Sequence, residues 1–99
     1  MTLTETNDTV TRFSRAARRA VENRDWATVI ACASEIQRLD PDNAEGWFLG
    51  GLAVKVEKKP LKAIAAFEKT LQLDPRRYDA AVELANQYSI ARRNADAAA

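Results

Sequence analysis

The chain has 99 residues, enough for one domain and too few for two. Its 15 Lys and Arg residues nearly balance its 14 Asp and Glu residues, so the net charge of +1 favours neither nucleic acid nor an anionic membrane as a partner. With no histidine and with Cys32 as the single cysteine, the chain cannot by itself form an internal disulfide, the usual zinc sites or a histidine-based triad. Its longest apolar runs are also far shorter than a membrane span. We therefore expect a cytoplasmic protein that is not an enzyme and holds no metal or cofactor.

Helical periodicity begins after a polar start. Residues 1–8 lack apolar periodicity and are expected to be disordered. Asp8 or Thr9 is then expected to cap a first helix over residues 9–23, where apolar residues recur at helical spacing.

The second and third predicted helices are separated by an Asp-Pro pair. Asp25 is expected to cap the second helix, which ends before Pro41 because proline cannot continue the hydrogen-bond ladder. Asp42 or Asn43 is expected to cap a third helix over residues 44–57.

The last part of the chain predicts two further helices and the start of another. Pro60 suits the first position of a fourth helix, which carries two apolar stripes and ends before a second Asp-Pro pair. A fifth helix is expected over residues 77–91, with Leu84, Ala85 and Tyr88 facing inward. A turn is expected at 92–94 and the start of a sixth helix at 95–99.

The two Asp-Pro pairs indicate an internal repeat. The spacing from Pro41 to Pro75 equals the period of a helix-turn-helix repeat, about 34 residues. At this spacing apolar residues match apolar ones and small residues match small ones. The matches are Trp47 with Phe13, Gly51 with Ala17, Val54 with Ala20, Ala63 with Val29, Phe67 with Ala33 and Leu73 with Leu39, and, one period later, Ala85 with Gly51 and Tyr88 with Val54.

As a set, these residues resemble the tetratricopeptide repeat family. The matching positions are Trp47, Gly51, Ala63, Phe67 and Pro75 in the central copy, Phe13, Ala17 and Pro41 in the first, and Leu84, Ala85, Tyr88 and Ala97 in the third. The resemblance implies an all-α, right-handed superhelical solenoid of antiparallel helix pairs, with five helices in about two and a half repeats. The domain would cover residues 9–99, with repeats over 9–41, 42–75 and the incomplete 76–99.

The central copy departs from the family pattern at two adjacent glycines. Gly50 stands where the pattern has leucine, and two glycines inside a helix cost about 1 kcal/mol each relative to alanine. Our hypothesis is that Phe13 or Trp26 packs over Gly50 and Gly51. The incomplete third copy leads us to interpret the chain as a piece of a larger bacterial protein of this family.

By the same resemblance, the first helix of each pair lines a concave groove for an extended peptide or a partner helix. The apolar residues of the third helix are either anchors in this groove or are covered by another element. The expected groove residues are Arg15, Arg18, Glu45, Phe48, Leu49, Leu52, Val56, Glu83 and Asn86, together with Ser14, Val82 and Ile90.

The function implied is that of a protein-protein interaction scaffold. The alternative is a regulatory or oligomerising domain of a larger enzyme, such as a sulfotransferase or a glycosyltransferase. Self-association through the C-terminal end, where Leu84, Tyr88 and Ile90 would be exposed, is a third possibility.

Other candidate features favour structural roles. The arginines of the first helix are better explained as a solvated face than as a phosphate site. Carboxylates near the turns are explained by helix capping, and Cys32 by burial among small residues.

Overall fold

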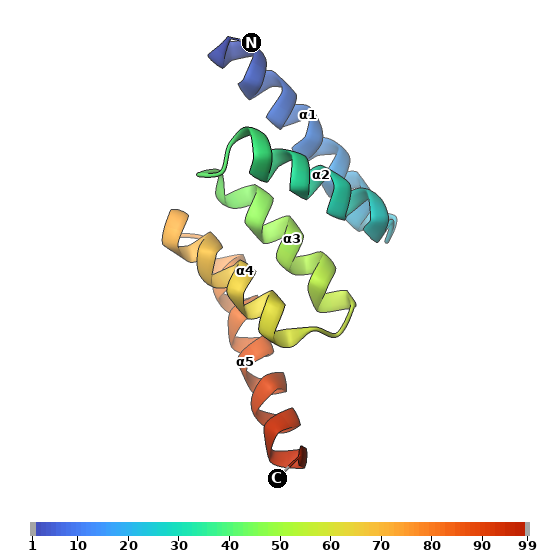
Figure 1. Ribbon diagram of the computed structural model, residues 1–99, viewed down its shortest axis with the longest axis vertical. Coiled ribbons are helices and arrows are strands. Elements are labelled where there is room, and N and C mark those ends of the chain that lie inside the picture. The colour runs from blue at the N-terminus through green and yellow to red at the C-terminus, as the bar shows by residue number, and fades with distance from the viewer. Residues whose placement is uncertain (1, 99) are drawn as a thin grey trace.

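The computed structural model describes residues 2–98, which form five helices and no strand (Figure 1). The helices are α1 Leu3–Glu22, α2 Trp26–Leu39, α3 Ala44–Val56, α4 Pro60–Leu73 and α5 Tyr78–Ala98. Each helix packs against the next one in the chain, and successive helices run in opposite directions (Figure 1). The resulting stack measures 53 × 27 × 19 Å. The predicted all-α architecture of consecutive helix pairs is confirmed.

Two apolar clusters hold the stack together. The first lies between α1, α2 and α3 and contains Ala17, Val29, Ala33, Ile36 and Leu49 among its buried members. The second lies between α3, α4 and α5 and contains Phe48, Ala63, Phe67 and Ala80. α3 contributes to both clusters, so apolar residues lie all around it. None of the helices in the described part of the chain is long and apolar enough to cross a membrane.

The sequence period is repeated in the backbone. Arg24 and Lys58, which are one period apart, follow the first helix of each pair in the left-handed conformation, with φ of 56° and 60°. In both turns the N–H of the next residue donates to a carbonyl in the last turn of the helix: Asp25 donates to Ala20, and Lys59 donates to Val54. Equivalent turns with equivalent hydrogen bonds show that α1–α2 and α3–α4 are two copies of one unit.

Helix starts follow the capping rules at three of the predicted positions. The Asp25 carboxylate accepts from the Thr28 N–H at 3.3 Å, and the Asn43 side chain accepts from the Glu45 N–H at 2.9 Å. Pro60 occupies the first position of α4. These three predictions are confirmed.

The N-terminal prediction was wrong for residues 2–8, and Met1 lies outside the described residues. α1 begins at Leu3, because Thr2 and Glu5 form a capping box in which each side chain accepts from the other residue's N–H. The Thr-x-x-Glu signal was present in the sequence, and it moves the cap away from Asp8 and Thr9.

The turn predicted at 92–94 was also wrong. α5 continues through this segment to Ala98, so no sixth helix starts at Ala95, and Ala99 lies outside the described residues. The equivalent turn after α3 is followed directly by Pro60, which stops α3 from continuing through it. The segment Arg92–Asn94 has no proline or glycine and leads into alanines, which favour helix.

The glycine pair is covered by different residues from those expected. A Cβ atom on Gly51 would lie 2.5 Å from Cε1 of Phe67, and one on Gly50 would lie 3.1 Å from Nε2 of Gln37. Neither Phe13 nor Trp26 is among the nearest atoms, so that hypothesis was wrong. Gly51 lies where α3 approaches α4 closely, and Gly50 lies where α3 approaches α2 closely.

Candidate functional site

The first helices of the pairs, α1 and α3, and the unpaired α5 are joined along one face by side-chain contacts. Arg18 of α1 reaches Glu45 of α3, and Lys55 of α3 binds Glu83 of α5 with 2.8 Å between Nζ and Oε2. These contacts hold together the helices that were expected to line the groove.

Glu45 is the centre of a charge network on this face. Arg18 donates to its two carboxylate oxygens from Nε and Nη2, both at 2.7 Å, and Ser14 donates at 3.1 Å. Arg77, just before α5, donates to Glu45 at 3.2 Å and to Asp79 at 3.0 Å. Partial burial raises the pKa of Glu45, but the hydrogen bonds and positive charges outweigh it, and the net pKa is lowered. Arg18 and Glu45 are therefore engaged within the chain.

Phe48 lies beneath the same arginines. The guanidinium carbon of Arg77 lies 4.6 Å from the centre of its ring and that of Arg18 lies 5.8 Å away, both within cation–π distance. The Phe48 ring also packs against Phe67, with 5.8 Å between centroids. Only 5% of Phe48 is exposed, so the expectation that it is an open apolar anchor was wrong.

The prediction that Leu49 lines the groove was also wrong. Leu49 has no exposed surface and belongs to the α1–α2–α3 cluster. The neighbouring helices α1 and α2 cover Leu49, which agrees with the alternative that another element covers the apolar residues of the third helix. Leu52 is half-buried and packs against the second cluster.

Several of the other predicted groove residues are exposed. Val56 and Val82 are exposed large apolar residues, at 43% and 60%. Arg15 and Asn86 are exposed as well, whereas Glu83 is half-buried in its ion pair with Lys55. The accessible part of the face thus shifts from the middle of α3 towards the end of α3 and α5.

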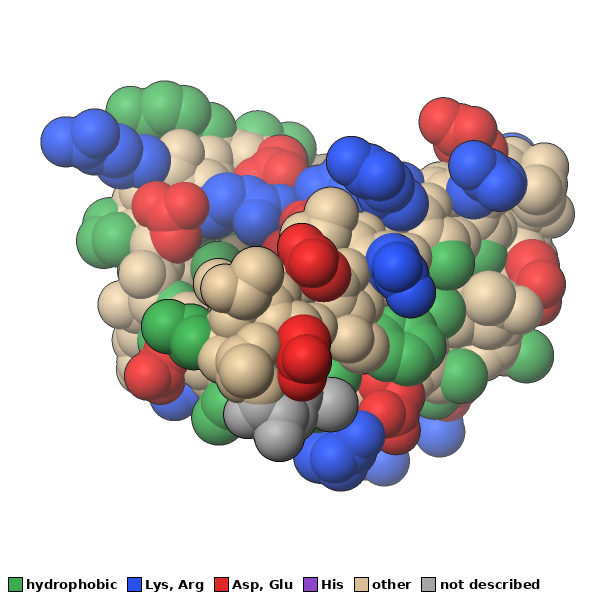
Figure 2. Space-filling model, turned by 90° about the horizontal axis from the view of Figure 1, so that it is seen from above, with side chains coloured by type: hydrophobic (Ala, Val, Ile, Leu, Met, Phe, Trp, Pro, Cys, Tyr) green, Lys and Arg blue, Asp and Glu red, His purple; other side chains and the backbone are tan. Residues whose placement is uncertain are grey.

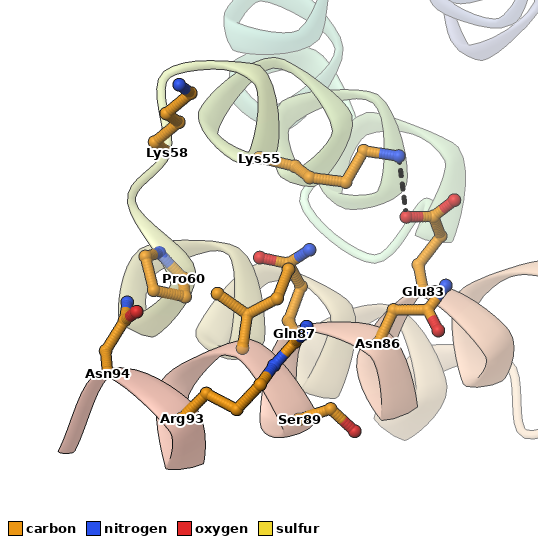
Figure 3. Close-up of a pocket in the computed structure, with 10 residues that line it drawn as sticks. Lys55, Lys58, Pro60, Glu83, Asn86, Gln87, Ser89, Arg93 and Asn94 are labelled. Carbon is orange, nitrogen blue, oxygen red and sulfur yellow. Dashed lines mark hydrogen bonds and ion pairs between the residues drawn. The ribbon is translucent and has the colours of Figure 1, made fainter. Parts of the chain in front are cut away.

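A cavity of about 600 Å³ opens at this place, between the end of α3 and α5 (Figure 3). Its lining includes the predicted groove residues Glu83, Asn86 and Ile90. The side chains that sequence reasoning did not assign to the groove are Lys55, Lys58, Pro60, Gln87, Ser89, Arg93 and Asn94. A cavity of this size can hold a few residues of a peptide.

Gln87 is the clearest residue that the sequence interpretation missed. It is 3% exposed, and its amide has no hydrogen-bond partner among the side chains and backbone of residues 2–98. Figure 3 shows the amide pointing from α5 into the space towards the end of α3. Gln87 lies one repeat period after Ala53, which is buried. A polar residue at the equivalent of a buried position was therefore a signal in the sequence that Gln87 is unusual.

In the first two copies, the residues at the repeat positions lie in the core or against it. Ala17, Gly51, Ala63 and Phe67 are buried, and the partly buried Phe13 packs on the core. Trp47 is half-buried, and its Nε1 donates to the carbonyl of Pro41 at 2.9 Å.

The third copy differs. Leu84 packs against the second cluster, but Ala85 is exposed and Tyr88 is 50% exposed, so the expectation that both face inward was wrong. Ala80 and Gln87 are the buried residues of α5. The equivalent of Ala85 on α3 is Gly51, on which Phe67 of α4 packs, and no helix among residues 2–98 takes the corresponding place beside α5. Tyr88 reaches back to α4, where its hydroxyl donates to Glu68 at 2.6 Å.

Charged residues are mixed elsewhere on the surface. Figure 2 shows Lys and Arg side chains interspersed with Asp and Glu over one end of the molecule. No group of three or more His, Cys, Asp or Glu side chains among residues 2–98 is placed to hold a metal ion. Cys32 is buried, as predicted, and burial raises the pKa of its thiol.

Part of a known repeat protein is similar to this chain. No known family model matches the chain. The chain is similar to tetratricopeptide repeat protein 37 of Xenopus laevis, at 29% identity over 82 residues, which is 83% of this chain. The chain spans 5% of the length of that protein. This similarity and the repeated helix pairs both support a tetratricopeptide-like helical repeat.

Proposed function

We propose that this chain is a protein-interaction module that binds an extended peptide or a partner helix along α3 and α5. The observation that carries the proposal is the cavity between the end of α3 and α5, two helices that also carry the accessible apolar residues Val56 and Val82. The similarity to a tetratricopeptide repeat protein supports a protein partner in general terms.

The binding face differs from the one expected from the sequence. Phe48 and Leu49 are buried and provide no anchor, so the apolar contribution comes from Val56 and Val82 with the half-buried Leu52. The Arg18–Glu45–Arg77 network lies at one side of these residues and fixes α1, α3 and α5 relative to one another. A preformed face of this kind loses little conformational entropy on binding.

A selection from a displayed library of random peptides tests the proposal. Val82→Glu places a charge on the face without disturbing the core, because Val82 is 60% exposed. Ile30→Glu is the matched control on α2, where Ile30 is 40% exposed. We expect enriched peptides to lose binding to the Val82 variant and to keep binding to the Ile30 variant. A library that yields no binding peptide, or equal loss in both variants, would refute the proposal.

The exposed side of α5 supports a second candidate interaction, self-association. Ala81, Ala85 and Tyr88 correspond, one repeat period later, to the face of α3 on which Phe67 of α4 packs. We propose that a second copy of the chain covers this side. Light scattering over a concentration series should show a dimer that Ala85→Glu abolishes and that Ala31→Glu, at an exposed alanine of α2, leaves intact. A monomer at every concentration would rule out this candidate.

A further inference from the structure

We infer that the cavity between α3 and α5 recognises a carboxylate in an extended peptide, so that the module prefers acidic partners. The inference rests on the proposed peptide-binding function and assigns it a ligand chemistry. Two independent features of the cavity carry it, its charge and the position of Gln87.

The charge of the cavity is positive. Lys55, Lys58 and Arg93 line it, and Glu83 is the single carboxylate in the lining. Glu83 is already paired with Lys55 at 2.8 Å. Neither Lys58 nor Arg93 forms an ion pair with any of the residues that the structure describes. Two cations at the rim of a partly enclosed site are therefore available to an anionic group.

Gln87 supplies the second feature. Its side chain is almost fully buried, yet its amide points into the cavity without a partner in the described chain (Figure 3). No side-chain N or O atom among residues 2–98 is both fully buried and unpaired, so the amide keeps access to the cavity. A primary amide has both donors and an acceptor, so it can pair with the N–H and C=O of a peptide backbone. An apolar ligand that closed the cavity would bury the Gln87 amide without a hydrogen-bond partner, which costs binding free energy. The site therefore favours a polar ligand.

The two features suit one ligand. A backbone amide of the peptide would pair with Gln87, while the carboxylate of an adjacent acidic residue would lie near Lys58 and Arg93. Asn86 adds a polar group and Ile90 an apolar contact to the lining. Inorganic phosphate could meet the cations but could not pair with the amide in the way that a peptide does.

The test uses the full chain labelled with ¹⁵N and two synthetic peptides followed by NMR. The probes are acetyl-Ala-Glu-Ala-Glu-Ala-amide and its matched form with glutamine in place of glutamate. We expect the acidic peptide to shift the side-chain amide signals of Gln87 and to bind about five-fold more tightly than the neutral one at low salt.

Three variants locate the effect. Arg93→Glu should abolish the preference for the acidic peptide. Arg92→Glu makes the same charge change on an exposed residue outside the cavity and should preserve the preference. Gln87→Leu should weaken both peptides while leaving thermal unfolding unchanged or raised, because leucine fills the same space without a buried amide. Circular dichroism confirms that each variant is folded.

The outcomes separate this inference from the proposed function. Equal binding of the two peptides at Gln87 overturns the acidic preference and leaves a peptide site in place. Equal effects of Arg92→Glu and Arg93→Glu, shifts confined to other parts of the chain, or binding of inorganic phosphate as tight as that of the acidic peptide also overturn it. If neither peptide binds, the inference is wrong, and the library selection then decides on the proposed function by itself.

Discussion

The adjacent glycines of α3 give a sharp test of how the helices pack. Gly51→Ala is expected to destabilise the protein and Gly50→Ala to stabilise it, although the two changes are chemically identical. Both glycines lie inside a helix, so alanine gains about 1 kcal/mol of helix propensity at either position. The difference must therefore come from what the added methyl group meets.

At Gly51 the methyl group meets a fixed aromatic ring. Three ring carbons of Phe67 would lie 2.5, 2.8 and 2.9 Å from the new Cβ, and Phe67 has no exposed surface into which it can move. Overpacking of a filled core costs about 1–3 kcal/mol, and the upper part of that range applies because the ring is also held against Phe48. After the propensity gain, the net loss is about 1–2 kcal/mol.

At Gly50 the methyl group meets a side-chain end. Its nearest neighbour is Nε2 of Gln37 at 3.1 Å, which belongs to a flexible side chain and can shift by a few tenths of an ångström. That shift strains the bond from Gln37 to the Gly46 carbonyl, so the net gain is at most about 0.5–1 kcal/mol.

Urea unfolding of the wild type and both variants measures the two free energies. A double-mutant cycle adds the decisive control, because in a Phe67→Leu background the ring is gone and Gly51→Ala should become neutral or stabilising. If Gly51→Ala is as stable as the wild type, or if its cost persists without the ring, the proposed Gly51–Phe67 contact is not the reason for the glycine.

Three further predictions follow from named contacts. Glu45→Gln should cost about 1–2 kcal/mol at neutral pH, because it removes a charge held by Arg18 and Arg77. The folded-state pKa of Glu45 is lowered below 4.5, so this stability is present above that pH and is lost as the pH falls through the folded-state pKa. Urea unfolding at about pH 7 and about pH 3 should show the wild type and the variant converging, and a constant difference would contradict the reasoning. Cys32 is buried and its pKa is raised, so Ellman's reagent should label the native thiol about 100-fold more slowly than the unfolded one, and rapid native labelling would contradict its burial. Arg24→Gly should raise the unfolding free energy by about 0.5–1 kcal/mol, since φ is 56° there, and calorimetry showing a lower Tm would count against it.

The order of the helices and their repeat could be predicted from the sequence because the signals are local. Apolar spacing, the two Asp-Pro pairs and the cap residues act within one or two helical turns, so the sequence itself defines α2, α3 and α4 to within about two residues. The N-terminal start was predictable too, because Thr2 and Glu5 form a recognised cap pair. The extension of α5 was harder to predict, because its end depends on the absence of a stop signal.

The candidate site was decided by tertiary structure. Spacing placed Phe48 and Leu49 on the groove side of α3, but only the positions of Arg77 and of the neighbouring helices show that these residues are covered. Gln87 becomes notable only because α5 buries it beside a cavity that the end of α3 encloses. Local sequence therefore determined the helices and their repeat. Burial and cavity shape depend on residues far apart in the chain, and only the packed structure brings those residues together.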